Sequence, residues 1–203
     1  AAAALVVTID GEELTSNGMA AAHPTQRTSR SASPKEDRDA HRSVKMHVEL
    51  LGDVPVDDIN GCGPATLSMY LRFYGWEGDQ FDINEIIKPD RADRNVNIEE
   101  LDHFTGNYAG WLSSVYRVGG DVETLKRLIA AGVPVMIEEG DELAQQYWPD
   151  DDMWAGHFLL INGYDDSTQT FTAQDSFRSA DRQVAYVDTD RRWKPFNRVF
   201  ILI

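Results

Sequence analysis

The longest regular pattern of apolar and polar positions follows Cys62. Large apolar side chains recur at spacings of three and four residues, at Leu67, Tyr70, Leu71 and Tyr74. This spacing places them on one face and predicts an amphipathic α-helix. Pro64 suits the first turn of a helix because its φ angle is already helical, and Gly75 is a plausible stop. The pattern therefore predicts a helix that begins close to Cys62.

Three further stretches have helical patterns. Residues 83–88 form a short one that ends at Pro89. Residues 97–104 begin with Asn97 as N-cap and carry Glu100 three residues later, which is the spacing of a capping box. Residues 122–131 follow Asp121, a favourable N-cap, and end at Gly132.

Apolar runs of strand length occupy the C-terminal half. We expect strands at 133–138, 156–166 and 198–203, and a return strand at 170–174 that forms a hairpin with 156–166. Antiparallel pairing brings residues near the two open ends of such a hairpin close together. His157 and Asp175 lie near those ends.

The first 45 residues differ from the rest of the chain. Residues 5–9 could form one short strand, but residues 15–43 contain almost no large apolar side chain. Such a segment cannot bury enough surface to offset its ordering entropy. We therefore divide the chain into residues 1–45, a linker, pro-region or tail, and a domain of residues 46–203 whose first strand we expect at 47–51.

Composition limits the classes of function. The apolar content of 42% is ordinary for a globular domain, and the net charge of −15 argues against a nucleic-acid partner. No apolar run is long enough to span a bilayer. One cysteine cannot form a disulfide within the chain. The five histidines show no metal-ligand spacing, so we expect no metal and no cofactor.

Cys62 would lie at a helix N-terminus if the predicted helix forms. The unpaired N–H groups and the helix dipole there favour the negatively charged thiolate and could also hold an oxyanion. A lone cysteine is, however, most often a small buried apolar residue. A catalytic cysteine also needs a base and a group that orients the base, and His157 and Asp175 supply both residue types. Taken singly, His157 could equally be a core histidine and Asp175 a turn cap.

Three motifs together resemble a known family. They are Cys-Gly-Pro-Ala-Thr-Leu-Ser-Met at 62–69, Gly-His-Phe-Leu-Leu-Ile-Asn-Gly-Tyr-Asp at 156–165 and Gln-Asp-Ser at 174–176. Over residues 47–203 the chain resembles the papain-like cysteine peptidases related to the bacteriocin-processing, double-glycine-cleaving enzymes. The resemblance implies an α+β fold in which a helical half with the nucleophile packs on an antiparallel β-sheet. It also implies Cys62 as nucleophile, His157 as general base and acid, and Asp175 as the residue that orients His157.

One feature departs from that family. Its members usually carry a glutamine shortly before the cysteine, whose amide donates to the oxyanion, and no glutamine occurs at 56–61. The candidates here are Asn60, Asp58 and Asp57, together with the Cys62 backbone N–H. A carboxylate would repel the developing charge, and loss of one donor typically costs about 100- to 1,000-fold in rate.

The sequence therefore leaves three hypotheses for function. The first is a cysteine peptidase that hydrolyses peptide bonds through a thioester, with Trp76, Trp148, Trp154 and Gly156 near the substrate. Trp76 could equally be a core residue. The second is a weak or inactive peptidase-like module that binds peptides, and the third is a papain-like acyl or peptidyl transferase. By the resemblance, we expect a bacterial protein that is extracellular or attached to the cell envelope; the oligomeric state is not predicted.

Overall fold

The computed structural model describes residues 6–9, 12–15, 43–50, 60–90, 93, 96–140 and 156–203. The chain separates into two compact units, residues 1–42 and residues 43–203. In the first unit, β1 (Val6–Ile9) pairs antiparallel with β2 (Glu12–Thr15). The prediction of a strand near residues 5–9 is confirmed.

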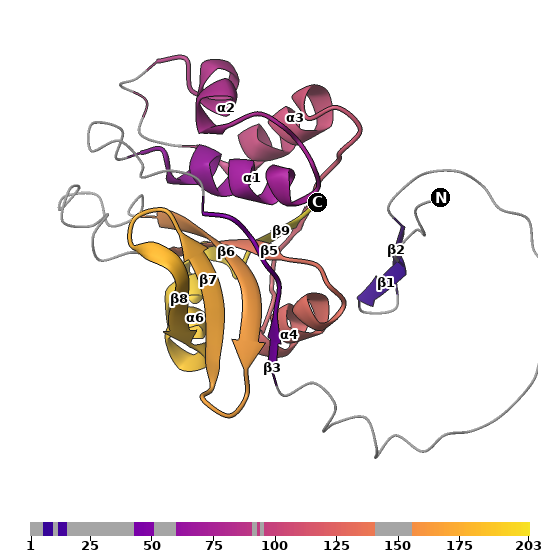
Figure 1. The fold of residues 1–203 in the computed structure, drawn as a ribbon, viewed down its shortest axis with the longest axis vertical. Helices are drawn as coiled ribbons and strands as arrows, with labels where there is room; N and C mark the ends of the chain where they lie inside the picture. The colour runs from indigo at the N-terminus through magenta and orange to yellow at the C-terminus, as the bar shows by residue number, and fades with distance from the viewer. Residues whose placement is uncertain are drawn as a thin grey trace, which may run out of the picture. The chain divides into compact units, whose positions relative to one another are not determined.

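The second unit is an α+β domain, and its elements are drawn in Figure 1. Its helices are α1 (Cys62–Phe73), α2 (Gln80–Ile87), α3 (Ile98–Tyr108), α4 (Val122–Ala130), α6 (Tyr186–Trp193) and the short 3-10 helix η1 (Lys194–Phe196). Its strands are β3 (Ser43–Lys45), β4 (Val115–Arg117), β5 (Val135–Gly140), β6 (Gly156–Asp165), β7 (Thr170–Asp175), β8 (Ser179–Ala185) and β9 (Phe200–Leu202).

The strands form one antiparallel sheet in the order β4-β9-β5-β6-β7-β8. β6 is ten residues long, so it pairs with β5 through its first half and with β3 through its last three residues. The predicted hairpin of β6 and β7 is confirmed. The predicted first strand at 47–51 is wrong, because residues 47–50 form no strand and the pairing with β6 is made by Ser43–Lys45.

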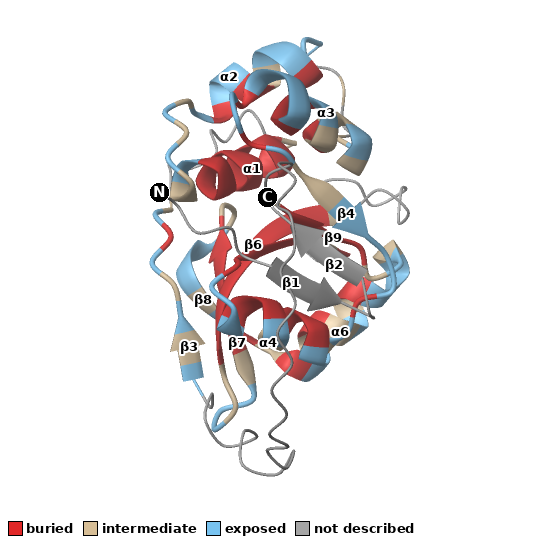
Figure 2. Ribbon diagram, turned by 90° about the vertical axis from the view of Figure 1, so that its right-hand side faces the viewer, coloured by how far each residue is buried: buried red, intermediate tan, exposed pale blue. Residues whose placement is uncertain are grey.

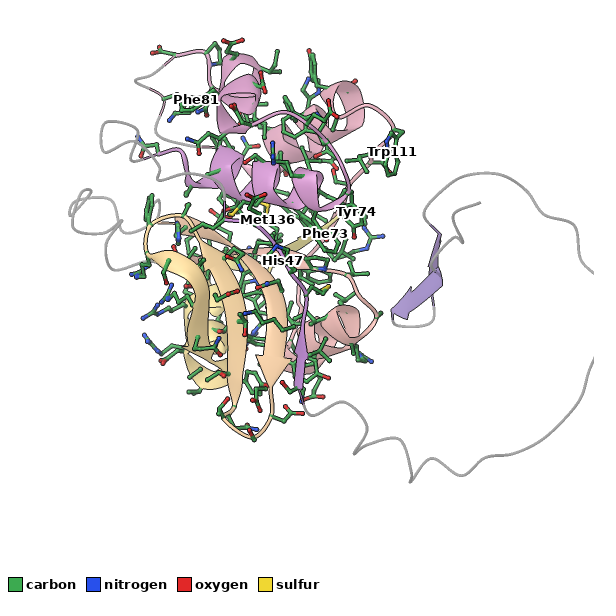
Figure 3. The ribbon with its side chains drawn as sticks, in the orientation of Figure 1. His47, Phe73, Tyr74, Phe81, Trp111 and Met136 are labelled. Carbon is green, nitrogen blue, oxygen red and sulfur yellow. The ribbon has the colours of Figure 1, made fainter. Side chains whose placement is uncertain are left out.

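Helices cover both faces of this sheet. Met136, Phe158 and Leu160 lie in the core that is shared with α1, α2 and α3, and Figure 3 shows Met136 between α1 and the strands. Because successive strand side chains point to opposite faces, Leu159 and Ile161 face the other side, where α4 and α6 pack. Figure 2 shows α1 and β6 as nearly continuously buried elements.

The helix ends agree with the caps read from the sequence. Asn97 accepts a hydrogen bond from the Glu100 N–H, and Glu100 returns one to the Asn97 N–H, which completes a capping box. The Asp121 carboxylate accepts from the Thr124 N–H at 2.7 Å. The helix predicted from Cys62 starts at that residue and is followed by Gly75 with a φ of 90°. None of the described helices is long and apolar enough to cross a membrane.

Candidate active site

Cys62 is the first residue of α1, which is buried from Cys62 to Leu71. Gly61 caps the helix without a side-chain hydrogen bond, and the first turn contains no acidic residue. The N-terminal N–H groups of the helix therefore face no competing carboxylate from their own turn. This arrangement favours negative charge at the Cys62 sulfur.

Two contacts fix the first turns of α1 against β6. The Thr66 hydroxyl donates to the Phe158 carbonyl oxygen at 3.0 Å, one helical turn after Cys62 and one residue after His157. Gly63 also packs beside β6, where an added Cβ would lie 3.3 Å from Val96 and 3.4 Å from the Phe158 ring. The elements that carry Cys62 and His157 are therefore joined directly beside both residues.

His157 lies on β6 and Asp175 on the neighbouring strand β7, and both side chains are fully buried. His157 Nε2 lies 2.8 Å from Asp175 Oδ1. An ionised carboxylate can only accept hydrogen bonds, so Nε2 carries the proton and Nδ1 is the nitrogen left to exchange a proton with a thiol. Among the described residues, Nδ1 accepts no hydrogen bond from a nitrogen or oxygen donor, and a further interaction of the ring is with Cys62.

The charges of Cys62, His157 and Asp175 depend on one another. Burial lowers the pKa of His157, but the hydrogen bond to Asp175 and the interactions with Cys62 outweigh burial and raise that pKa to about 10. Burial raises the pKa of Asp175, but His157 and Arg182 lower it well below its usual range. A protonated imidazole between two negative groups is thus the favoured state, provided that the thiol is ionised.

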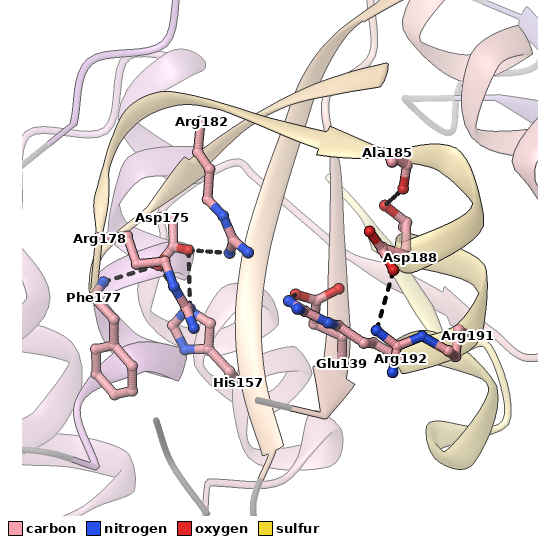
Figure 4. A network of polar contacts seen from close by, with 11 residues as sticks. Glu139, His157, Asp175, Phe177, Arg178, Arg182, Ala185, Asp188, Arg191 and Arg192 are labelled. Carbon is pink, nitrogen blue, oxygen red and sulfur yellow. Dashed lines mark hydrogen bonds and ion pairs between the residues drawn. The ribbon is translucent and has the colours of Figure 1, made fainter. Parts of the chain in front are cut away.

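Other residues complete the surroundings of the pair, and Figure 4 shows them. The Phe177 ring stacks on the His157 ring with centroids 4.3 Å apart, and the Phe177 N–H donates to Asp175 Oδ1 at 2.9 Å. Asp175 Oδ2 accepts hydrogen bonds from Arg182 Nη1 at 2.5 Å and from Arg178 Nη1 at 3.5 Å. Sequence patterns gave no signal for Thr66, Phe177 or Arg182, because each contact joins separate elements or crosses a turn.

Only some of the predicted substrate and oxyanion residues lie in the part of the chain that the structure describes. Asp57, Asp58, Trp148 and Trp154 lie outside the described residues. Asn60 lies in the turn that leads into α1 and stays a candidate donor.

Gly156 and Trp76 can be placed. A Cβ on Gly156 would lie 2.7 Å from Glu138 Oε1 and 3.0 Å from the Phe196 ring, so a larger residue beside His157 would require these side chains to move. Trp76 packs edge-on against Phe104 beyond the last turn of α1. A helix of this length separates its ends by roughly 18 Å. Trp76 therefore lies far from Cys62 along α1 and packs against the core, as the core alternative has it, and a contact with substrate stays a prediction.

Comparison with known proteins agrees with this arrangement. Residues 41–201 match the model of the Peptidase_C39 like family. The chain belongs to the C39-like peptidase family. No curated protein sequence matches it.

Solved structures of C39-like and cysteine proteases share the fold. A C39-like peptidase from Bacillus anthracis has a TM-score of 0.61 at 17% identity, and the match covers 79% of this chain and 97% of that one. A double-glycine motif protease from an AMS/PCAT transporter, solved with its leader peptide, has a TM-score of 0.55 at 16% identity and coverages of 78% and 91%. Xylellain, a cysteine protease from Xylella fastidiosa, has a TM-score of 0.53 at 14% identity and coverages of 80% and 85%.

The predicted fold class is confirmed by these likenesses. The C39-like domain has the mixed helix and antiparallel-sheet architecture of papain-like cysteine proteases. Among the described residues, no group of three His, Cys, Asp or Glu side chains could hold a metal ion.

Proposed function

We propose that this C39-like domain is a cysteine peptidase that hydrolyses peptide bonds through a thioester, with Cys62, His157 and Asp175 as its triad. The observation that carries the proposal is the hydrogen bond of His157 to Asp175 through Nε2, which leaves Nδ1 for the thiol. The interactions of Cys62 with the same ring support it.

Acylation begins with the Cys62 thiolate and the His157 imidazolium. The sulfur attacks the carbonyl carbon of the peptide bond and forms the C–S bond, while the carbonyl oxygen becomes an oxyanion. When the C–N bond breaks, His157 gives its Nδ1 proton to the leaving amine. The Nε2 proton stays on the hydrogen bond to Asp175 throughout, which keeps the ring oriented.

Deacylation uses the neutral imidazole as a base. Nδ1 takes a proton from water as the water oxygen attacks the thioester carbon, and breakage of the C–S bond releases the carboxylic acid and restores the ion pair. In both steps we assign the oxyanion to the N-terminal N–H groups of α1, including that of Cys62, with Asn60 as the side-chain candidate.

The substrate class proposed for this chain is a peptide or an unfolded protein segment. The double-glycine motif protease with the same fold was solved with a leader peptide, which supports a peptide ligand here as well. The absence of a glutamine before Cys62 favours slow turnover. For this reason a silent peptide-binding module is the competing function.

The test has two readouts, thiol reactivity and peptide cleavage. We expect iodoacetamide to alkylate Cys62 faster than free cysteine near pH 7, and H157A to remove this difference. We expect the wild type, but not C62S, to cleave members of a mixed peptide library detected by mass spectrometry. If Cys62 reacts no faster than free cysteine and H157A changes nothing, the catalytic function is wrong.

A second variant separates a weak enzyme from a silent module. D58Q restores an amide shortly before Cys62, and D57Q places the amide at the neighbouring candidate position. A gain in cleavage of about 100-fold in either variant would identify a peptidase limited by its oxyanion donors. Peptide binding without cleavage in the wild type and in both variants would identify the binding module instead.

A further inference from the structure

The carboxylate of Asp175 has two sides with different partners. Oδ1 accepts from His157 Nε2 and from the Phe177 N–H, whereas Oδ2 faces Arg182 at 2.5 Å and Arg178 at 3.5 Å. A carboxylate that is held on both oxygens cannot rotate freely about its terminal bond. The guanidinium group on Oδ2 therefore fixes the direction in which Oδ1 points.

The pairing of β7 with β8 brings Arg182 to this position. Arg182 lies opposite Ala173, two residues before Asp175 on the same face of the sheet. Side chains at such diagonal positions are within reach of a long residue. Because Ala173 carries only a methyl group, the arginine can extend along the strand toward Asp175. In Figure 4, Arg182 approaches the carboxylate from β8 and His157 approaches it from β6.

A β-bulge sets this register. Between the pairs Ala173–Arg182 and Asp175–Ser179, β8 contains one residue more than β7. Asp181 adopts a φ of 54°, the left-handed conformation that is common at bulges. Its carboxylate accepts from the Gln174 amide at 2.9 Å and forms an ion pair with Lys45 at 2.8 Å. Bulges often redirect a side chain beside an active site.

The positive charge of Arg182 has a second effect on Asp175, because it favours the ionised carboxylate. Asp175 is fully buried, and an isolated buried carboxylate would take up a proton. The charged groups that face it are His157 from β6, Arg182 from β8 and Arg178 from the intervening turn, and Cys62 faces His157 from α1. Arg182 and His157 both lower the pKa of Asp175.

We propose that Arg182 is a positioning residue of the triad, which holds Asp175 ionised and aims its Oδ1 at His157. The proposal rests on the function proposed above. Among the described residues, the hydrogen bond and the ion pair of the Arg182 guanidinium both go to Asp175, so we assign its effect to Asp175.

The experiment compares R182K, which keeps the charge, with R182Q, which keeps a donor but loses the charge. R191Q is the matched control, because Arg191 also pairs with an aspartate, Asp188, but at the exposed surface of α6. The kcat/KM of each variant is measured as a function of pH. We expect a loss of about 30-fold in R182Q and less than about fivefold in R182K, with R191Q unchanged.

The pH profile separates positioning from simple loss of structure. Without Arg182, Asp175 takes up a proton at higher pH, so we expect the acid limb of R182Q to move up by about 1 to 2 pH units. In a D175N background, R182Q should change kcat/KM by less than about twofold, because Arg182 has no carboxylate left to hold. Additive losses, or an unshifted acid limb in R182Q, would overturn the proposal.

A spectroscopic readout requires no turnover. The proton between His157 Nε2 and Asp175 should give a downfield 1H NMR signal that D175N removes. On acidification this signal should disappear at higher pH in R182Q than in the wild type and R182K. Identical behaviour in all three proteins would refute the role of Arg182 even if no substrate is cleaved. Slow alkylation of wild-type Cys62 would instead count against the peptidase function.

Discussion

Cys62 and His157 are held in place by different kinds of interaction. Cys62 is positioned by a helix whose first turns pack through Gly63 and Thr66 against β6, and the first turn of that helix contains no acidic residue. His157 is positioned by charge, through Asp175 and the arginines behind it. The difference teaches that the helix side should depend on packing and on the neutral hydrogen bond of Thr66, whereas the sheet side should depend on charge.

The largest expected effect comes from removing the charge of Asp175 while keeping its shape. D175N leaves Arg182 facing a neutral amide and allows His157 to adopt the wrong tautomer. We expect kcat/KM to fall about 1,000-fold, by analogy with loss of the acid in serine triads. We expect the free energy of unfolding to fall by about 2 kcal/mol, measured by urea denaturation.

D188N is the matched control for the buried pair. It breaks an aspartate–arginine pair of the same type, but the Asp188 and Arg191 side chains are 47% and 61% exposed. Surface pairs contribute about 0 to 1 kcal/mol, so D188N should be near neutral in both assays. Equal losses of kcat/KM and stability in D175N and D188N would contradict the expectation that only the buried aspartate matters.

The same comparison predicts the alkaline limit of activity. The raised pKa of His157, about 10, means that the imidazolium persists at neutral pH and loses its proton as the pH rises through that value. Any stability gained from its charge is complete below pH 6.5 and is lost over the same rise. Acylation should therefore decline above about pH 10 in the wild type and at lower pH in D175N, whose asparagine no longer stabilises the cation.

The sequence predicted the helix side better than the sheet side, for physical reasons. Helix caps act over three residues, so Asn97 with Glu100 could be recognised from spacing alone. β8 and α6 were missed because both contain few apolar residues: β8 has one buried residue, Val184, at an edge of the sheet, and the buried face of α6 includes the polar Thr189.

The approach of His157 to Asp175 was predicted, whereas the contacts that support Asp175 were not. His157 and Asp175 lie near the open ends of a hairpin that the pattern revealed, so their approach follows from antiparallel pairing. Arg182 reaches Asp175 through a bulge, and a one-residue bulge in a polar strand leaves no signal in hydropathy. The first strand was placed at 47–51 because Val48 is apolar, yet the pairing of Ser43–Lys45 depends on backbone groups that any sequence possesses.

A smaller effect is expected on the helix side from T66V. Valine has nearly the shape of threonine but cannot donate to the Phe158 carbonyl oxygen. We expect a loss of about 1 kcal/mol in the free energy of unfolding and a fall of about tenfold in kcat/KM, because α1 is no longer fixed beside His157. T66S keeps the hydroxyl and should retain most of the activity. A pH profile that moves in T66V would show that charge also contributes on the helix side.

The smallest effect concerns Glu138 of β5, whose carboxylate lies near the charge of Glu99 on α3. Burial, followed by the nearby Glu99 of α3, raises the pKa of Glu138 to about 7. An acid with a raised pKa contributes stability that is complete below its ordinary value of about 4.3 and is lost as the pH rises through the folded-state value. Glu138 should therefore destabilise the domain above pH 7 but not at pH 4.

E138Q tests whether the charge of Glu138 destabilises the domain at high pH. We expect it to raise the free energy of unfolding by about 1 kcal/mol at pH 8 and to change it little at pH 4, as measured by urea denaturation at both pH values. E99Q removes only the second cause, so it should act in the same direction but more weakly. A larger gain in E99Q than in E138Q would mean that repulsion from the helix side, rather than burial in the sheet, dominates at this carboxylate.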